Sequence, residues 1–189
     1  MFRGGAGVRY PMTVWLRSVL RMRVAPVAIA AVMMVAGCSP GVRPAAENRH
    51  MQPLSEQMLA ELAAKQMKKE SPILVRIFKE ESELEIWKKD ASGRFALLRT
   101  YPICRWSGEL GPKIKTGDRQ APEGFYTITP GLMNPNSSQY LAINTGFPNA
   151  YDRVNGRTGS FLMIHGGCSS AGCYAMTDDQ ISEMYALAR

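Results

Sequence analysis

One histidine and one cysteine near the end of the chain have the types and spacing needed for nucleophilic catalysis. His165 precedes Gly166, and Cys173 follows three small residues, Ser170 to Gly172. A cysteine attacks carbonyl groups as its thiolate, so it needs a neighbour that accepts the proton and carries positive charge. His165 can do both, and backbone N–H groups around Gly172 and Cys173 can stabilise an oxyanion. The motif predicts a cysteine-dependent acyl-transfer enzyme.

The first 37 residues have the parts of a secretory signal. They contain five arginines and no acidic residue, and an apolar run of 13 residues extends from Val24 to Ala36. A membrane-spanning helix needs about 20 residues, so this run fits a signal peptide better. The sequence Val35-Ala36-Gly37-Cys38 resembles the lipobox of bacterial lipoproteins, which implies cleavage before Cys38 and a lipid on its thiol. The alternatives are an ordinary core helix and an uncleaved anchor.

This assignment predicts where the protein works and which partners it has. Ser39 rather than Asp follows the cysteine, which in Gram-negative lipoproteins implies the outer membrane. We expect a periplasmic protein of the bacterial cell envelope, held at that membrane by its lipid. Removal of the five leader arginines lowers the formal charge from +7 to +2. The basic composition therefore reflects targeting, and nucleic acid is not an expected partner.

Two further cysteines, Cys104 and Cys168, remain after lipid attachment and catalysis are assigned. The cell envelope permits disulfides, and a Cys104–Cys168 bridge would brace the loop beside His165. Three free cysteines allow three pairings, and two buried free thiols are the alternative. These two cysteines with His165 and Cys173 also form a possible set of zinc ligands. Their spacing is unlike known zinc motifs, so we predict neither a metal nor another cofactor.

The remaining sequence predicts a mainly β catalytic domain with flanking helices. Residues 38–53 are rich in proline, which predicts a flexible tether, and apolar residues at helical spacing predict an amphipathic helix over residues 54–71. Thr177 and Gln180 form a capping-box pattern that begins a final helix. Residues 146–159 are expected to be one of several long loops. Alternating apolar residues predict strands over residues 73–78, 84–87, 95–104, 125–129, 141–144 and 161–165.

The combined motifs resemble the L,D-transpeptidase catalytic domain, also called the YkuD domain. His165-Gly166 with Ser170-Ala171-Gly172-Cys173 resembles its active-site signature, and residues 117–126 resemble its Thr-Pro-x-Gly segment. Residues 101–108 and 172–176 are similar to the YafK-like murein L,D-transpeptidase subgroup. The resemblance covers residues 72–189. It implies a β-sandwich or barrel with Cys173 as nucleophile and His165 as base.

The resemblance also implies a substrate and a reaction. The expected substrate is the peptidoglycan stem peptide, whose diaminopimelate carbonyl forms a thioester with Cys173 before transfer. Gly166, Ser170, Gly172 and Tyr174 line the same motif. Such a transferase takes part in peptidoglycan biosynthesis, cell-wall organisation and cell shape. The alternatives are a hydrolase of the same family, whose partner is a peptidoglycan-linked lipoprotein that it releases, and an inactive cell-wall-binding lipoprotein.

Two departures from the family pattern affect substrate binding. Ala171 and Ala175 stand where the family commonly has a histidine and an arginine. The lost arginine would guide a substrate carboxylate, so another basic residue is expected to replace it. The chain also ends at Arg189, where relatives often continue, so we expect either a C-terminally shortened protein or a fragment. The candidate carboxylate-binding residues are Arg105, Arg119, Arg153 and Arg157.

Overall fold

Alternation of apolar and polar residues builds the first of two β-sheets. The computed structural model describes residues 46–189, so the expected signal peptide and Cys38 lie outside the described residues. Strands β1 (Ile73–Phe78), β2 (Glu83–Lys89) and β3 (Phe95–Pro102) form an antiparallel sheet in the order β1-β2-β3. Every second residue of β2 is buried, as expected for a sheet with one face on the core.

The second sheet has five short strands and carries the predicted catalytic motif. Its order is β4-β8-β7-β6-β5, and the only parallel pair within this sheet is β7 with β8. The strands are β4 (Arg105–Trp106), β5 (Met133–Asn134), β6 (Ala142–Asn144), β7 (Met163–His165) and β8 (Tyr174–Ala175). The prediction of a mainly β domain is confirmed by these two sheets.

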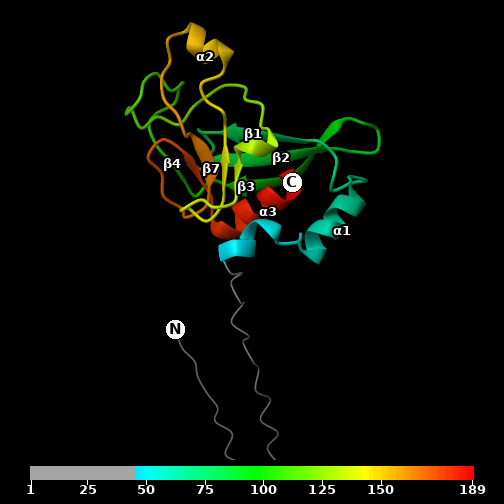
Figure 1. Cartoon of the computed structure of the whole chain (residues 1–189). Coiled ribbons are helices and arrows are strands. Elements are labelled where there is room, and N and C mark those ends of the chain that lie inside the picture. Colours follow the sequence, from blue (N-terminus) through cyan, green and yellow to red (C-terminus); the bar gives the residue numbers. More distant parts are fainter. Residues whose placement is uncertain (1–45) are drawn as a thin grey trace, which may run out of the picture. The chain divides into compact units, whose positions relative to one another are not determined.

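Helices cover the sheets and complete the core. Figure 1 shows α3 (Asp178–Ala188) below the three-stranded sheet, with α1 (Glu56–Ala64) at its side. The capping box at Thr177 and Gln180 is present and begins α3. Among residues 46–189, no helix is long and apolar enough to cross a membrane. Buried residues of α1, α3 and both sheets form one hydrophobic cluster, which includes Met58, Leu84, Leu98, Ile164 and Met184.

Lys88 occupies a core position of β2 and joins the sheet to the end of α3. Its side chain is fully buried, and its ammonium donates hydrogen bonds to the carbonyl oxygens of Lys69, Ser71 and Leu187. Burial lowers the pKa of Lys88, against the opposing effect of Glu70. Because an ammonium has three N–H donors, these three carbonyls satisfy it completely.

Several local predictions differ from the structure. The predicted strand over residues 125–129 is wrong, because these residues join neither sheet. The helix expected over residues 54–71 ends at Ala64, since Gln66 adopts a positive φ and Met67 then pairs with Asp90 as a β-bridge. Residues 46–51, expected within the tether, form the 3-10 helix η1 (Ala46–Met51). Short elements arise within two expected loops: η2 (Pro130–Leu132) and α2 (Ala150–Val154).

Candidate active site

The parallel pairing of β7 with β8 sets the relation between His165 and Cys173. Ile164 lies opposite Tyr174, and His165 lies opposite Ala175. Side chains alternate between the faces of a strand, so His165 and Cys173 share one face. A strand spacing of about 4.8 Å and a rise of about 3.3 Å per residue put their Cα atoms roughly 8 Å apart. The register therefore brings the two predicted catalytic residues to one side of the sheet.

The Cys173 thiol is partly exposed and is the free cysteine among residues 46–189. Its Sγ lies 3.8 Å from the carbonyl oxygen of Phe161, to which the S–H donates. Burial raises the pKa of the Cys173 thiol, while the backbone N–H of Met163 and the charge of Lys113 act in the opposite direction. The protonated thiol is thus the resting form at neutral pH, and forming the nucleophile requires a proton acceptor.

The His165 ring is buried and has a defined tautomer. Its Nδ1 lies 2.6 Å from the carbonyl oxygen of Gly166. A carbonyl can only accept, so Nδ1 carries a proton, and whenever the ring is neutral its lone pair is on Nε2. Within the described residues, no hydrogen bond joins this ring to the Cys173 thiol. The arrangement supplies an imidazole, with Nδ1 held by the Gly166 carbonyl, on the same face of the sheet as the sulfur.

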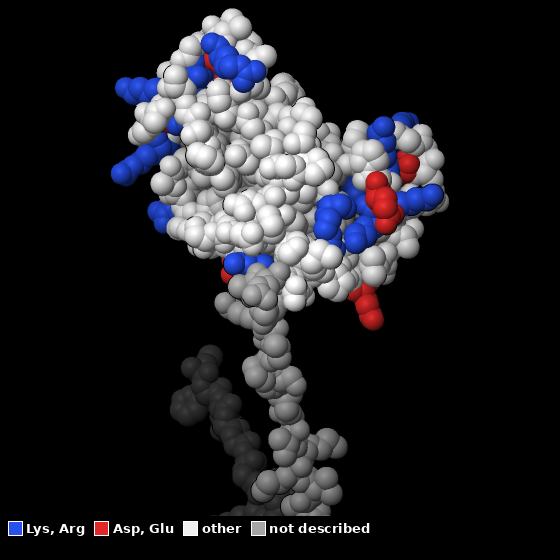
Figure 2. Space-filling view, in the orientation of Figure 1, with Lys and Arg blue, Asp and Glu red and all other residues white. Residues whose placement is uncertain are grey.

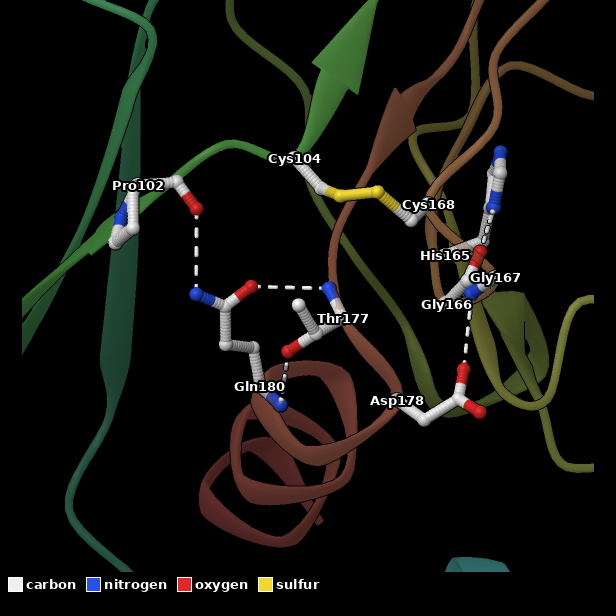
Figure 3. Close-up of a disulfide and its surroundings, with 9 residues drawn as sticks. All are labelled: Pro102, Cys104, His165, Gly166, Gly167, Cys168, Thr177, Asp178 and Gln180. Atoms are coloured by element: carbon white, nitrogen blue, oxygen red, sulfur yellow. Dashed lines mark hydrogen bonds between the residues drawn. A yellow bond between two sulfur atoms is a disulfide. The ribbon is translucent and has the colours of Figure 1, made fainter.

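The loop after β7 is held against the core at its start. A Cβ on Gly166 would lie 2.7 Å from Asp178 Oδ1 and 2.8 Å from the Gln139 carbonyl oxygen, so only glycine fits. The backbone N–H of Gly167 donates to Asp178 Oδ1 at 2.9 Å. Figure 3 shows the hydrogen bond between Gly167 and Asp178 beside the capping box of α3. The N-terminus of α3 therefore fixes the chain directly after His165.

A disulfide fixes the same loop from the other side. Cys104, directly before β4, is bonded to Cys168, and their Cα atoms are 5.3 Å apart (Figure 3). This is the pairing considered from the sequence. The bond also uses two of the four cysteine and histidine ligands of the zinc alternative, so that alternative does not fit this structure. In residues 46–189, no group of three or more candidate metal-ligating side chains is found.

Ser170 closes the loop that ends at Cys173. Its hydroxyl donates to the Cys173 carbonyl oxygen at 2.7 Å and accepts from the Cys173 N–H at 3.1 Å. The backbone nitrogen of Gly172 lies 3.4 Å from the Ser170 hydroxyl oxygen, which also accepts its N–H. Gly172 has a φ of 122°, a conformation that favours glycine. The two N–H groups expected to stabilise an oxyanion are thus occupied by Ser170 in the free protein.

Tyr174 has a structural position rather than one facing a substrate. Its side chain is buried, and its hydroxyl donates to the Pro122 carbonyl oxygen at 2.7 Å. Burial raises the pKa of Tyr174 well above its usual value. The register places it on the face of β8 opposite to Cys173. It therefore ties β8 to the loop that contains Pro122.

The four candidate arginines have different environments. Arg105 is exposed on β4 and lies opposite Ala175, while Arg119 is exposed and lies beside the nucleophile loop, its Cα 3.8 Å from the position of a Cβ on Gly172. Arg157 is bound to the buried Asp152 at 2.8 Å, and Arg153 donates to the Pro148 carbonyl. Only Arg105 and Arg119 are thus tied to the strand or loop of Cys173.

Basic side chains surround the part of the domain that carries α2. Figure 2 shows Lys and Arg projecting there, with few acidic side chains visible on this face. Lys113, which the sequence suggests only as part of a cleft wall and not as a charge acting on the site, is buried and acts electrostatically on Cys173. The signal for it was the pair Lys113 and Asp118, five residues apart in a glycine-rich loop.

Comparison with known proteins agrees with this geometry. The sequence model of the L,D-transpeptidase catalytic domain (YkuD) matches residues 74–189. The chain belongs to the L,D-transpeptidase catalytic domain family. The resemblance drawn from the motifs is thereby confirmed. This L,D-transpeptidase domain is 50% identical over 115 residues to YafK from Escherichia coli K12 and to YafK from strain O157:H7, each named as a candidate L,D-transpeptidase.

The matches cover only part of the relatives. The YafK alignments span 61% of this chain and 46% of each relative, so the chain spans about half the length of the curated relatives it matches. The helical cell shape determining protein Pgp2 (K307A mutant) from Campylobacter jejuni has a similar structure, with a TM-score of 0.54 and 24% identity. That comparison covers 78% of this chain and 53% of Pgp2, and it supports the L,D-transpeptidase fold alone.

Proposed function

We propose that this protein transfers an acyl group from peptidoglycan stem peptides through a thioester on Cys173. One observation carries the proposal: within an L,D-transpeptidase domain, a partly exposed free thiol and a basic imidazole share one face of the β7–β8 pair. Cysteine and histidine in this relation form the nucleophile and base of acyl-transfer enzymes. The substrate class follows from the family, whose members act on stem peptides.

In the first step, the Cys173 proton moves to Nε2 of His165 as sulfur attacks the diaminopimelate carbonyl. The S–C bond forms, and the carbonyl electron pair becomes an oxyanion. The tautomer fixed by the Gly166 carbonyl leaves Nε2 ready to accept this proton. Collapse of the oxyanion breaks the amide bond, and His165 returns the proton to the leaving amine. A thioester remains on Cys173.

The oxyanion requires a change at Ser170. The N–H groups of Gly172 and Cys173 are directed at the Ser170 hydroxyl, so an oxyanion must replace that hydroxyl as their acceptor. The hydroxyl also lies 3.3 Å from Ser107 Oγ, which offers it another partner. Each backbone donor of this kind contributes about 2.7–4 kcal/mol in other acyl-transfer enzymes.

Substrate carboxylates are bound, in this proposal, by basic residues near the sulfur. Arg119 and Arg105 are the favoured partners, because both are exposed and both are tied to the chain around Cys173. Ala175 is fully buried opposite His165, so position 175 offers no charge for this purpose. Arg157 is paired with Asp152 and Arg153 donates to the Pro148 carbonyl, so neither is favoured for this role.

The proposed location is the periplasmic side of the bacterial outer membrane. The support is the sequence of the first 38 residues, in which a basic region and an apolar run precede the lipobox-like Cys38. A lipid anchor there would keep the domain near peptidoglycan. Metabolic labelling with a palmitate analogue, compared between the wild type and Cys38→Ala, tests this location directly.

The decisive experiment for the reaction uses sacculi that carry covalently attached lipoprotein. The full chain and its Cys173→Ala variant are incubated with them, and the products are identified by mass spectrometry. New diaminopimelate–diaminopimelate cross-links or amino-acid exchange, present only with Cys173, are the expected result. Turnover that persists in Cys173→Ala would disprove the thioester mechanism.

Two other results would redirect the proposal. Release of lipoprotein bearing a diaminopimelate remnant would identify a hydrolase, in which water instead of an amine resolves the same thioester. Absence of any Cys173-dependent product would favour an inactive cell-wall-binding lipoprotein. His165→Ala is expected to lower turnover by orders of magnitude while leaving Cys173 available to alkylation.

A further inference from the structure

Lys113 has a buried, fixed ammonium group close to the active-site loop. Only 3% of its side chain is exposed. Nζ donates to Asp118 Oδ1 and to the Lys115 carbonyl oxygen, the latter at 3.0 Å. An ammonium has three N–H donors, so these two acceptors leave one donor available. A buried cation with an unused donor is costly unless another electron-rich group lies nearby.

One side of this ion pair lies against the chain that contacts the sulfur. The Cε atom of Lys113 lies 2.6 Å from the position that a Cβ on Gly159 would occupy, so the lysine packs directly on this glycine. Phe161 follows two residues later, and its carbonyl accepts the Cys173 thiol at 3.8 Å. Phe161 has a φ of 57°, a conformation rare outside glycine, asparagine and aspartate. Lys113 thus supports a strained segment that touches the nucleophile.

The other side of the ion pair lies beside the loop before Cys173. Asp118 accepts from the N–H groups of Ile114, Lys115 and Gln120, at 3.0, 2.9 and 3.0 Å. The intervening Arg119 has backbone atoms 3.7 and 3.8 Å from the position of a Cβ on Gly172. The ion pair therefore links two chain segments that flank Cys173 from different directions.

Few charged groups act on the thiol. His165 lies on the same face of the neighbouring strand, and its Nδ1 donates to the Gly166 carbonyl oxygen. Lys113 comes from the loop that precedes Asp118, and Asp118 partly neutralises it. Arg119 is exposed, so solvent screens its charge. Burial has the largest effect on the thiol and favours its neutral form, while Met163 N–H and Lys113 oppose it.

We propose that Lys113 is the cation that stabilises the Cys173 thiolate, and that Asp118 holds its ammonium in position. When the thiol proton moves to His165 Nε2, the buried charge of Lys113 stabilises the negative sulfur electrostatically. The inference deepens the proposed function and rests on it only for the role of Cys173 as nucleophile. Lys113 acts on the reacting sulfur, and Asp118 is a positioning residue.

The test is the pH dependence of Cys173 alkylation by iodoacetamide in the full chain, read from the peptide that contains Cys173 by mass spectrometry. Lys113→Met should raise the pH midpoint of the alkylation rate by about 1 pH unit, the shift typical of one nearby charge. Asp118→Asn should lower it, because the amide oxygen of asparagine still accepts from the ammonium and keeps it in place, while the counter-charge is lost. Lys115→Met, which removes an exposed charge two residues away, should leave the midpoint unchanged. Far-ultraviolet circular dichroism verifies that each variant is folded.

The opposite directions of the two shifts separate an electrostatic role from a merely structural one. A folded Lys113→Met protein with the wild-type midpoint would overturn the proposal, as would shifts of both variants in the same direction. If Lys113→Met does not fold, an unchanged or raised midpoint in Asp118→Asn overturns it alone. Alkylation needs no peptidoglycan, so inactivity toward sacculi with the expected midpoints would refute the proposed function and leave this inference standing.

Discussion

Replacing both Cys104 and Cys168 by serine tests how the catalytic loop is stabilised. The disulfide between these two cysteines joins residues separated by 64 positions, and it fixes the chain three residues after His165. A crosslink of this kind stabilises the folded protein mainly by limiting the conformations of the unfolded chain. The double variant removes this restraint and leaves no unpaired thiol beside Cys173.

The separation of 64 residues sets the expected size of the effect. The chain-entropy relation gives about 4 kcal/mol of stabilisation at 25 °C for a loop of this length. Native domains have only about 5–15 kcal/mol of total stability. The unfolding free energy of a small domain falls by about 2 kcal/mol for each molar of urea, so the urea concentration at the unfolding midpoint should be about 2 M lower in the double variant.

The assay is urea unfolding of the full chain, followed by circular dichroism without reductant. Cys173→Ser is the matched control, because it removes a thiol that closes no loop and should shift the midpoint little. A double variant whose unfolding free energy lies within about 1 kcal/mol of wild type would refute the reasoning. Addition of reductant should lower the stability of the wild type toward that of the double variant and leave the double variant unchanged.

Three further substitutions test other contacts of the fold. Gly166→Ala should cost about 1–3 kcal/mol in urea unfolding, because its Cβ would meet the Gln139 carbonyl, whereas Gly131→Ala has open space and should cost little. Lys88→Met should cost about 1–2 kcal/mol, since the buried Leu187 carbonyl loses its donor, while the neighbouring Lys89→Met should stay within about 0.5 kcal/mol of wild type. Burial alone would raise the pKa of Asp118, but hydrogen bonds from Lys113 and three backbone N–H groups hold it well below its usual value. Its stabilisation is therefore present above about pH 4 and is lost as the pH falls through the native pKa, so the stability difference between wild type and Asp118→Asn should shrink from pH 7 to pH 3. A difference that stays constant over this range would show that ionisation of Asp118 does not contribute.

The long elements of the fold could be predicted because their signals are local. Alternating burial defines β1, β2 and β3, and the side chains of Thr177 and Gln180 determine where α3 begins. The predicted strand over residues 125–129 has the composition of a strand, yet its backbone has other partners. Asn149 donates to the Phe125 carbonyl, and Tyr126 donates to Asp152, so this segment is tied to α2. Those contacts depend on residues more than 20 positions away.

The strands of the second sheet could not all be predicted, because three of them contain only two residues. No periodicity can be read from two residues, and their pairing depends on distant partners. Likewise, His165 and Cys173 could be selected by motif, but the link between Lys113 and Cys173 spans 60 positions and exists only in the folded chain. The motif therefore selects the two candidate reacting groups, whereas the charge that acts on Cys173 depends on distant parts of the chain.

The parallel pair β7–β8 explains why the motif needs its particular residues. Parallel neighbours usually require a crossover of about a dozen residues or more, whereas only the eight residues 166–173 connect these two strands. So short a connection is possible because the strands are two or three residues long, and it demands positive φ at Gly167, Cys168 and Gly172. Ser170 and the disulfide then hold this compact turn in place. Cys173 lies at its end, so the bonds that bring the chain back to the start of β8 also fix the sulfur relative to His165.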